Sequence, residues 1–373
     1  MAARNGSRGA AEIPVPASAT AIDAEWLSRI LNPRYPGVRV ESVAIADQAE
    51  VTNSHAWLDV RYASAQDAAE SGAPRSIFCK LLPNDPLRRT AIAQTQMGLR
   101  EAKFYERLGS QLSMRIPRVY GVCFEEEGEG AFAILLENIV EAGCTVSSGP
   151  ESPSRDSAAQ ALEDLAELHV RFEDPARRTS EASWVTGPSP PSDYGSMRLQ
   201  EGLDHHRDKL SVAFAEMSEV YIEKQAALHA LWSEGPKTVI HGDLHIGNLF
   251  DDQGRVGFLD WGLVVVGTPI RDVSYFLSMS LSIEDRRAHE RDLLRHYLEV
   301  RGALGGKEIS FDEAWKTHRL QASYLAPAAC QVVTFPEDVT PRRKKFASAF
   351  LARAEAAIED LESRSALREY AGI

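Results

Sequence analysis

The spacing of apolar and polar residues divides the chain into two regions of different character. In the first region, short apolar runs alternate with polar turns. In the segment 55–62, for example, Leu58, Val60 and Tyr62 would share one face of an extended strand. This two-residue period predicts β-strands. In the second region, apolar residues recur every three or four positions, as in 157–172, and this period predicts amphipathic helices.

The first region is predicted to be a set of strands wrapped around one main helix. The apolar runs predict strands at 38–45, 55–62, 77–82, 119–124 and 131–137, and helices at 22–31 and 88–112. The polar stretch 64–74 is expected to be a hairpin loop. Residues 1–20 are small, polar and proline-containing, and we expect a disordered arm there.

The second region is predicted to be mostly helical. Helical spacing covers 157–172, 199–232, 272–282, 284–303, 311–331 and 340–366, and a loop-and-strand block lies at 238–263. We therefore expect two domains, a β-rich lobe at 21–139 and a helical lobe at 140–373. The apolar segment 324–335 is predicted to be core in preference to the lining of a ligand pocket.

Composition and charge narrow the functional classes. The 373 residues are 44% hydrophobic and 25% charged, which is typical of a globular protein with a sizeable core. A net charge of -13 disfavours a nucleic-acid partner. No window approaches the roughly 20 apolar residues of a membrane span. The four cysteines are widely spaced and form no C-x-x-C pair, so we expect a reduced, cytoplasmic protein without a zinc knuckle.

The block 239–262, VIHGDLHIGNLFDDQGRVGFLDWG, contains the residues with the clearest chemical meaning. Asp243 is followed five residues later by Asn248, and Asp260 precedes Trp261 and Gly262. Phosphoryl transfer requires a carboxylate that orients the attacking hydroxyl and hard oxygen ligands for Mg²⁺. The spacing between Asp243 and Asn248 is that of a kinase catalytic loop, and Asp260 stands where a metal-binding aspartate would follow.

The motifs HGDLHIGN and FLDWG resemble the catalytic signature of aminoglycoside phosphotransferases and related choline and ecdysteroid kinase-like proteins. The resemblance covers roughly residues 40–280. It implies an α+β, bilobal, protein-kinase-like fold with a small β-rich N-lobe around one main helix and a larger, mostly helical C-lobe. It also implies transfer of a phosphoryl group from ATP or GTP to the hydroxyl of a small molecule.

The resemblance assigns a role to each matching residue of the catalytic block. Asp243 is expected to be the catalytic base. Asn248 and Asp260 are expected to bind Mg²⁺.

In the N-lobe, the resemblance makes Lys80 the lysine that binds the phosphates and Glu101 its ion-pair partner, with Glu106 as the competing candidate. Glu137 and Asn138 lie in the hinge whose backbone is expected to meet the adenine. The turn between the first two strands contains no glycine, which departs from the Gly-rich loop of protein kinases.

Several alternatives stay open at the level of sequence. The chain could be a catalytically silent binding protein of the same fold, or a protein kinase, although Gly242 stands where protein kinases have arginine. His241 and His245 could be metal ligands, but bracing of the loop by hydrogen bonds is favoured. Asp272 is expected to accept backbone N–H bonds. The acceptor is undetermined: an amine could meet Asp204 or Glu201, and an aminoglycoside is only one possibility.

Overall fold

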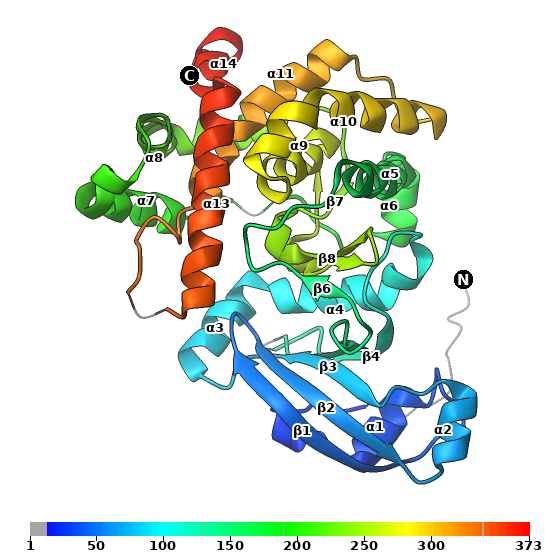
Figure 1. Ribbon diagram of the computed structural model, residues 1–373. Helices are drawn as coiled ribbons and strands as arrows, with labels where there is room; N and C mark the ends of the chain where they lie inside the picture. The colour runs from blue at the N-terminus through cyan, green and yellow to red at the C-terminus, as the bar shows by residue number, and fades with distance from the viewer. Residues whose placement is uncertain (1–12, 129, 189, 338) are drawn as a thin grey trace, which may run out of the picture. The chain divides into compact units, whose positions relative to one another are not determined.

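The computed structural model describes residues 13–128, 130–188, 190–337 and 339–373. Within these ranges the chain forms two compact units (Figure 1). The N-terminal unit contains the described residues of Met1–Ser110 and Arg118–Ala142, and the C-terminal unit contains Gln111–Pro117 and the described residues of Gly143–Ile373. The antiparallel sheet of the first unit and the helices of the second confirm the predicted α+β class.

The N-terminal unit is built on an antiparallel sheet with the strand order β1-β2-β3-β5-β4. Its strands are β1 (Val40–Glu50), β2 (Ser54–Tyr62), β3 (Ser76–Leu81), β4 (Val119–Phe124) and β5 (Phe132–Glu137). Its helices are η1 (Ala19–Ala21), α1 (Ala24–Leu31), α2 (Ala65–Ser71), α3 (Pro86–Thr95) and α4 (Met97–Arg107). The short helix η2 (Gly109–Gln111) follows where the chain passes into the other unit.

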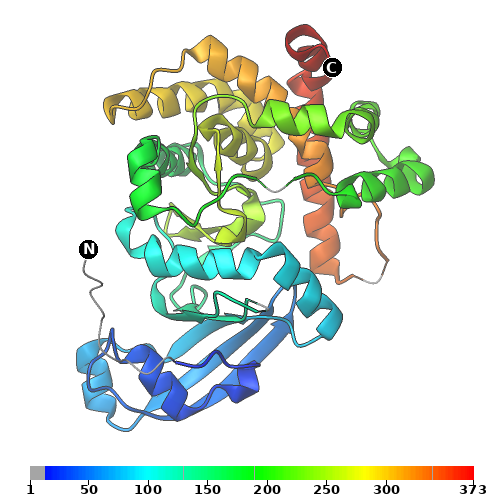
Figure 2. The same ribbon diagram turned by 180° about the vertical axis from the view of Figure 1, so that it is seen from behind.

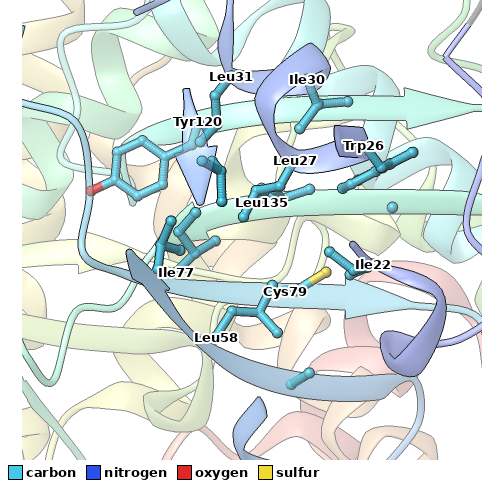
Figure 3. Packing of buried hydrophobic residues seen from close by; sticks show 14 of the residues in the cluster. Ile22, Trp26, Leu27, Ile30, Leu31, Leu58, Ile77, Cys79, Tyr120 and Leu135 are labelled. Atoms are coloured by element: carbon cyan, nitrogen blue, oxygen red, sulfur yellow. The ribbon is translucent and has the colours of Figure 1, made fainter. Parts of the chain in front are cut away.

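Helix α1 covers one face of this sheet (Figure 3). The carboxylate of Asp23 caps the helix by accepting a bond from the N–H of Trp26 at 2.7 Å. Leu27 packs with Ile77 and Cys79 of β3 in the same buried cluster. Because side chains alternate along a strand, Lys80 points to the opposite face. The pleat therefore separates the hydrophobic core from the lysine.

The chain that leads into α1 takes part in the same core. Ile13 and Val15 pack against the buried cluster, and the indole N–H of Trp26 donates to the carbonyl of Pro14 at 2.7 Å. Of the arm expected at residues 1–20, residues 13–20 thus contact the first unit, and residues 1–12 lie outside the described ranges.

Two local predictions for this unit are wrong. The expected loop at 64–74 contains α2, because Ser64 caps its N-terminus and Gly72 adopts the left-handed conformation that ends it. The expected single helix at 88–112 is two helices, α3 and α4, which are separated by Gln96 at a φ of 54°.

A third feature was not anticipated from the sequence. Between α4 and β4, residues 111–117 belong to the C-terminal unit. There the carbonyl of Arg115 accepts a bond from the N–H of Phe258, and its guanidinium lies 2.6 Å from Asp252.

The C-terminal unit is mostly helical, with two small antiparallel sheets. Its strands are β6 (Thr145–Val146), β7 (Thr238–Ile240), β8 (Leu249–Asp252), β9 (Arg255–Phe258) and β10 (Val265–Gly267), ordered β6-β8-β9 and β10-β7. Its α-helices are α5 (Arg155–Arg171), α6 (Pro175–Glu181), α7 (Asp193–His206), α8 (Val212–Trp232), α9 (Pro269–Ser280), α10 (Ile283–Ala303), α11 (Phe311–Gln321), α12 (Leu325–Ala328), α13 (Pro341–Asp360) and α14 (Ser363–Ala371). Short 3-10 helices are η3 (Arg207–Lys209), η4 (Ile246–Asn248), η5 (Trp261–Leu263) and η6 (Ala322–Tyr324).

The position of α9 matters most for the candidate site. This helix is buried along almost its whole length and packs against α11 and α13 (Figure 1; Figure 2 shows these helices from behind).

The single helix expected at 199–232 is wrong, because α7 ends at His206 and Ser211 caps α8 as a separate helix. No helix within the described ranges combines the length and the apolar character needed to span a bilayer.

Candidate active site

In the N-terminal unit, Lys80 and Glu101 form a buried ion pair. The Nζ atom of Lys80 lies 2.9 Å and 3.0 Å from the two carboxylate oxygens of Glu101, which projects from α4. Their side chains are 8% and 1% exposed. The competing Glu106 instead contacts Arg107 on the exposed side of the helix. The structure therefore contains the predicted ion pair, on the sheet face opposite to α1.

Glu137 and Asn138 lie at the end of β5, beside the first residues of β3. The backbone N–H of Glu137 donates to the carbonyl of Arg118, and its carboxylate accepts a bond from the Arg118 N–H at 3.0 Å. The side-chain amide of Asn138 donates to the hydroxyl of Ser76 at 2.8 Å. These bonds hold the segment in place through both side chains and through the backbone N–H of Glu137.

The turn between β1 and β2 is stabilised without a glycine. The N–H of Val51 bonds to the carbonyl of Asn53 at 3.0 Å, and the carbonyl of Val51 accepts a bond from Arg88 of α3. Asn53 is only 6% exposed, and its Oδ1 atom makes no hydrogen bond within the part of the chain that the structure describes. The turn thus keeps its shape without glycine, and it buries an acceptor oxygen instead of presenting glycine N–H groups.

In the C-terminal unit, Gly242 lies just after β7, within the block 239–262. Its φ is 85°, and an added Cβ would lie 2.4 Å from the carbonyl oxygen of Leu263. Any other residue would be strained in conformation and would clash with backbone. The close approach of the segment after Asp260 therefore explains why glycine stands before Asp243.

Asp272 of α9 anchors the start of this loop. Its carboxylate accepts the backbone N–H of His241 at 2.6 Å and that of Gly242 at 2.8 Å, which confirms the role predicted for it. His169 lies 3.4 Å from the same carboxylate, and its other ring nitrogen contacts the hydroxyl of Tyr297 at 2.8 Å. Burial would raise the pKa of Asp272, but the bonds from His169 and Gly242 outweigh it and lower that pKa. The loop is thus fixed by an ionised carboxylate.

The two histidines of the motif brace the loop, as predicted. His241 accepts the N–H of Asp243 at Nδ1, and its Nε2 lies 2.8 Å from the carbonyl of Leu259. Burial lowers the pKa of His241, which keeps the ring neutral. His245 accepts the N–H of Gly247 at Nδ1. Among the described residues, no group of three or more His, Cys, Asp or Glu side chains could hold a metal ion.

Asn248 and Asp243 are joined directly. The amide nitrogen of Asn248 donates to the carbonyl and to the carboxylate of Asp243, at 2.9 Å and 3.0 Å. Since its donor group faces Asp243, the amide oxygen is the atom that Asn248 can offer to a cation. The carbonyl of Asn248 also accepts the N–H of Leu259, which places the following Asp260 beside it in the hairpin. This amide and carboxylate are hard oxygen donors and fit Mg²⁺.

Asp260 stands at a point of backbone strain. Its φ of 58° and ψ of 70° are left-handed, which is unusual for a residue other than glycine. Aspartate tolerates this region better than most residues, and strained conformations of this kind occur often at functional sites. The strain turns the chain abruptly from β9 into η5.

The environment of Asp243 favours its ionised form. Its side chain is 26% exposed. Burial would raise its pKa, but the charge of His245, whose Nε2 lies 3.6 Å away, and the bond from Asn248 lower it below the usual range. Tyr275 of α9 is also involved: burial and the nearby charge of the Asp243 carboxylate raise the pKa of this tyrosine. The sequence contained no signal for Tyr275, because its helical spacing does not show which groups its face meets.

Comparison with known proteins identifies the family. The model of the phosphotransferase enzyme family, APH, matches residues 86–307, which is more than half of the chain. The match includes Glu101 and the whole catalytic block, and Lys80 lies just before it. No curated protein matches the chain.

Solved structures with a similar fold belong to small-molecule kinases. The GDP complex of aminoglycoside 2'-phosphotransferase-IIIa is 12% identical with a TM-score of 0.50, over 90% of this chain and 99% of that chain. Spectinomycin phosphotransferase with ADP and spectinomycin is 12% identical (TM-score 0.49; 91% and 97% covered), and choline kinase LicA from Streptococcus pneumoniae is 13% identical (0.48; 87% and 94%). At these identities the likeness concerns the fold alone, and it rests on the first structure. The family match and the motifs within it lead to one conclusion: the chain belongs to the phosphotransferase enzyme family.

Proposed function

We propose that the protein transfers the γ-phosphoryl group of ATP or GTP to a hydroxyl of a small molecule. The observation that carries this proposal is the Asp243–Asn248 hydrogen bond within a loop anchored by Asp272. This arrangement leaves a carboxylate oriented by an amide, and an amide oxygen for a cation. Membership of a phosphotransferase family supports the same chemistry.

The proposed reaction assigns the proton and the phosphoryl group as follows. The carboxylate of Asp243 accepts the proton of the acceptor hydroxyl, whose oxygen forms a bond to the γ-phosphorus. The bond between that phosphorus and the β–γ bridging oxygen breaks, and the nucleoside diphosphate leaves. The lowered pKa of Asp243 keeps it ionised before the reaction. The oxygens of Asn248 and Asp260 would hold Mg²⁺, which neutralises charge on the phosphates when bound.

The N-terminal unit is proposed to bind the nucleotide. Lys80 would contact its phosphates, and Glu101 keeps the ammonium extended by the bonds described above. The backbone at Glu137 and Asn138 would meet the base. The C-terminal unit would supply the metal ligands and the acceptor pocket, and a cytoplasmic location agrees with four free cysteines.

Two other functions are less well supported. A silent binding protein would not require the buried Lys80–Glu101 pair together with Asp243, Asn248 and Asp260, yet all five are present. A protein kinase would need an activation segment after Asp260, whereas α9 begins at Pro269.

Nucleotide consumption by the purified protein tests the proposal. ATP and GTP would each be offered with Mg²⁺ and a panel of hydroxylated acids, amines, sugars and sterols. We expect acceptor-dependent release of ADP or GDP, a phosphorylated product by mass spectrometry, and loss of both on chelation of Mg²⁺ with EDTA. If no acceptor increases nucleotide consumption and the protein still binds nucleotide, the silent binding protein is the better description.

A further inference from the structure

Arg271 is a cation without an anionic partner in the first turn of α9. Its guanidinium lies 4.4 Å from the centre of the Tyr324 ring. Its side chain makes no hydrogen bond or ion pair within the described ranges of the chain, and its buried Nε atom is unsatisfied. A buried N–H of a charged group without an acceptor is costly. The side chain is therefore positioned for an acceptor that the protein does not itself provide.

The dipole of helix α9 adds to the cost of burying the Arg271 charge without a partner. Arg271 is in the first turn of a twelve-residue helix, where the helix dipole is positive and disfavours another cation. The neighbouring Asp272 cannot neutralise it fully, because that carboxylate accepts the N–H groups of His241 and Gly242. An anion bound at Arg271 would relieve both the unsatisfied donor and the repulsion.

This cation is near the proposed catalytic base. Tyr275 follows Arg271 by one helical turn, so the two side chains share one face of α9, about 6 Å apart at their Cβ atoms. The Tyr275 ring lies 5.6 Å from Tyr324 and 6.3 Å from His245, whose Nε2 is 3.6 Å from the Asp243 carboxylate. Arg271 and Asp243 therefore lie on either side of the same group of rings, within one unit.

The surroundings are aromatic. Phe346 and Phe350 of α13 lie 6.0 Å and 5.3 Å from His245, and Trp232 lies 5.2 Å from Tyr324. An aromatic or otherwise flat apolar body would complement such rings.

The residues considered for amine binding are engaged elsewhere on α7. Glu201 pairs with Arg198 at 2.7 Å, and Asp204 accepts a bond from Gln200 at 2.8 Å. Most of the segment 324–335 is core, as predicted, since Leu325, Ala326, Ala329 and Val333 are at most 1% exposed. Its first residue, Tyr324, instead faces Arg271.

We propose that the acceptor is a carboxylate-bearing alcohol with a flat apolar body, whose carboxylate is bound by Arg271 while its hydroxyl meets Asp243. This inference rests on the proposed function and names its substrate class. The planar guanidinium matches a carboxylate by paired N–H···O bonds. A polycationic acceptor such as an aminoglycoside would be repelled by Arg271.

Three probes that share a benzyl alcohol body and carry an anionic, a neutral or a cationic para group test the inference: 4-(hydroxymethyl)benzoate, its carboxamide, and 4-(aminomethyl)benzyl alcohol. Their binding to the full chain is measured by titration calorimetry. We expect the carboxylate to bind at least about tenfold more tightly than the other two, as a charge-assisted pair allows. Equal or tighter binding of the amine, or no binding of the carboxylate, would overturn the proposal.

Variants identify the side chain responsible. Arg271→Gln should reduce the preference for the carboxylate to within about twofold, and Arg271→Lys should keep part of it because the charge remains. Arg271→Lys also gives a result if Arg271→Gln does not fold. The matched control is Arg291→Gln, which removes another arginine stacked on a ring, 4.0 Å from Trp315, and should change nothing. Retention of the full preference in Arg271→Gln contradicts the proposal.

Nucleotide consumption separates this inference from the proposed function. Carboxylate preference without transfer to any acceptor would mean that the anion site exists and the kinase proposal fails. Acceptor-dependent transfer to neutral or cationic alcohols that Arg271→Gln does not affect would mean that the protein is a kinase and that the anion site does not exist.

Discussion

The two units hold their proposed active residues in different ways. In the N-terminal unit, Lys80 and Glu101 neutralise each other directly, and both side chains are almost fully buried. In the C-terminal unit, Asp243 is 26% exposed and is held by an amide, a histidine and backbone groups. A buried pair is costly to break, because a buried charge is left behind. Removing the charge of a partly exposed carboxylate leaves no fully buried charge behind, so it should cost the fold less.

The largest effect on activity should come from Asp243→Asn, which tests whether the partly exposed carboxylate serves the reaction more than the fold. The amide cannot accept the proton of an acceptor hydroxyl, so turnover should fall by about 10²- to 10⁴-fold. The fold should survive, because the carboxylate that anchors the loop is that of Asp272. Steady-state kinetics and thermal unfolding measure the two quantities.

Asp251→Asn is the matched control for this substitution. Asp251 is an exposed aspartate of the same block, and its carboxylate accepts the N–H of Gly254 in the hairpin turn. The turnover of the Asp251→Asn variant should equal that of the wild type. Near wild-type turnover in Asp243→Asn would instead remove Asp243 from the mechanism.

The next effect concerns the buried pair. Lys80→Met leaves the Glu101 carboxylate buried without its partner, and the free energy of unfolding should fall by about 3–5 kcal/mol. The double variant Lys80→Met/Glu101→Leu removes both charges and should recover most of that loss, yet nucleotide binding should stay impaired. Denaturant unfolding and nucleotide titration of the two variants separate stability from function.

Lys103→Met is the control for the pair. Lys103 lies 2.7 Å from Glu126, whose side chain is 55% exposed, so this ion pair should contribute less than about 1 kcal/mol. If the double variant binds nucleotide as the wild type does, Lys80 has only a structural role.

The sequence predicted those site residues that can be recognised by their residue type and by their spacing along the chain. Lys80 in a strand, Glu101 on the next helix and Asp243 with Asn248 form recognisable patterns, and Asp272 was expected to bind backbone. The break at Gln96 was not predicted, because a glutamine in the left-handed conformation carries no local signal. Ser64 and Gly72 were available as cap signals for α2, but the polar composition of the segment favoured a loop.

The features that the sequence did not predict depend on contacts between residues far apart in the chain. Residues 111–117 join the C-terminal unit through a bond between Arg115 and Phe258, which are far apart in sequence and show no shared pattern. Periodicity predicted a helix that includes Tyr275, but it did not show that this face meets Asp243. The same limit concealed Arg271, whose importance comes from the lack of an ion-pair partner for it within the described residues.

The smallest effect should come from His245→Gln, which alters the field at Asp243 but keeps a polar side chain. His245 lowers the pKa of Asp243, by its charge and by a hydrogen bond. The ionised carboxylate therefore contributes stability above its ordinary pKa, which is lost as the pH falls through the lowered value. Without His245 that pKa rises, so both this loss and the acidic limb of kcat/KM should move to higher pH. At neutral pH Asp243 stays ionised in both proteins, and kcat should change by less than about threefold.

The control is His296→Gln, which removes an exposed histidine paired with Glu163 and should leave the pH profile of kcat/KM unchanged. An acidic limb that does not move in His245→Gln would show that Asp243 is not the group that titrates there.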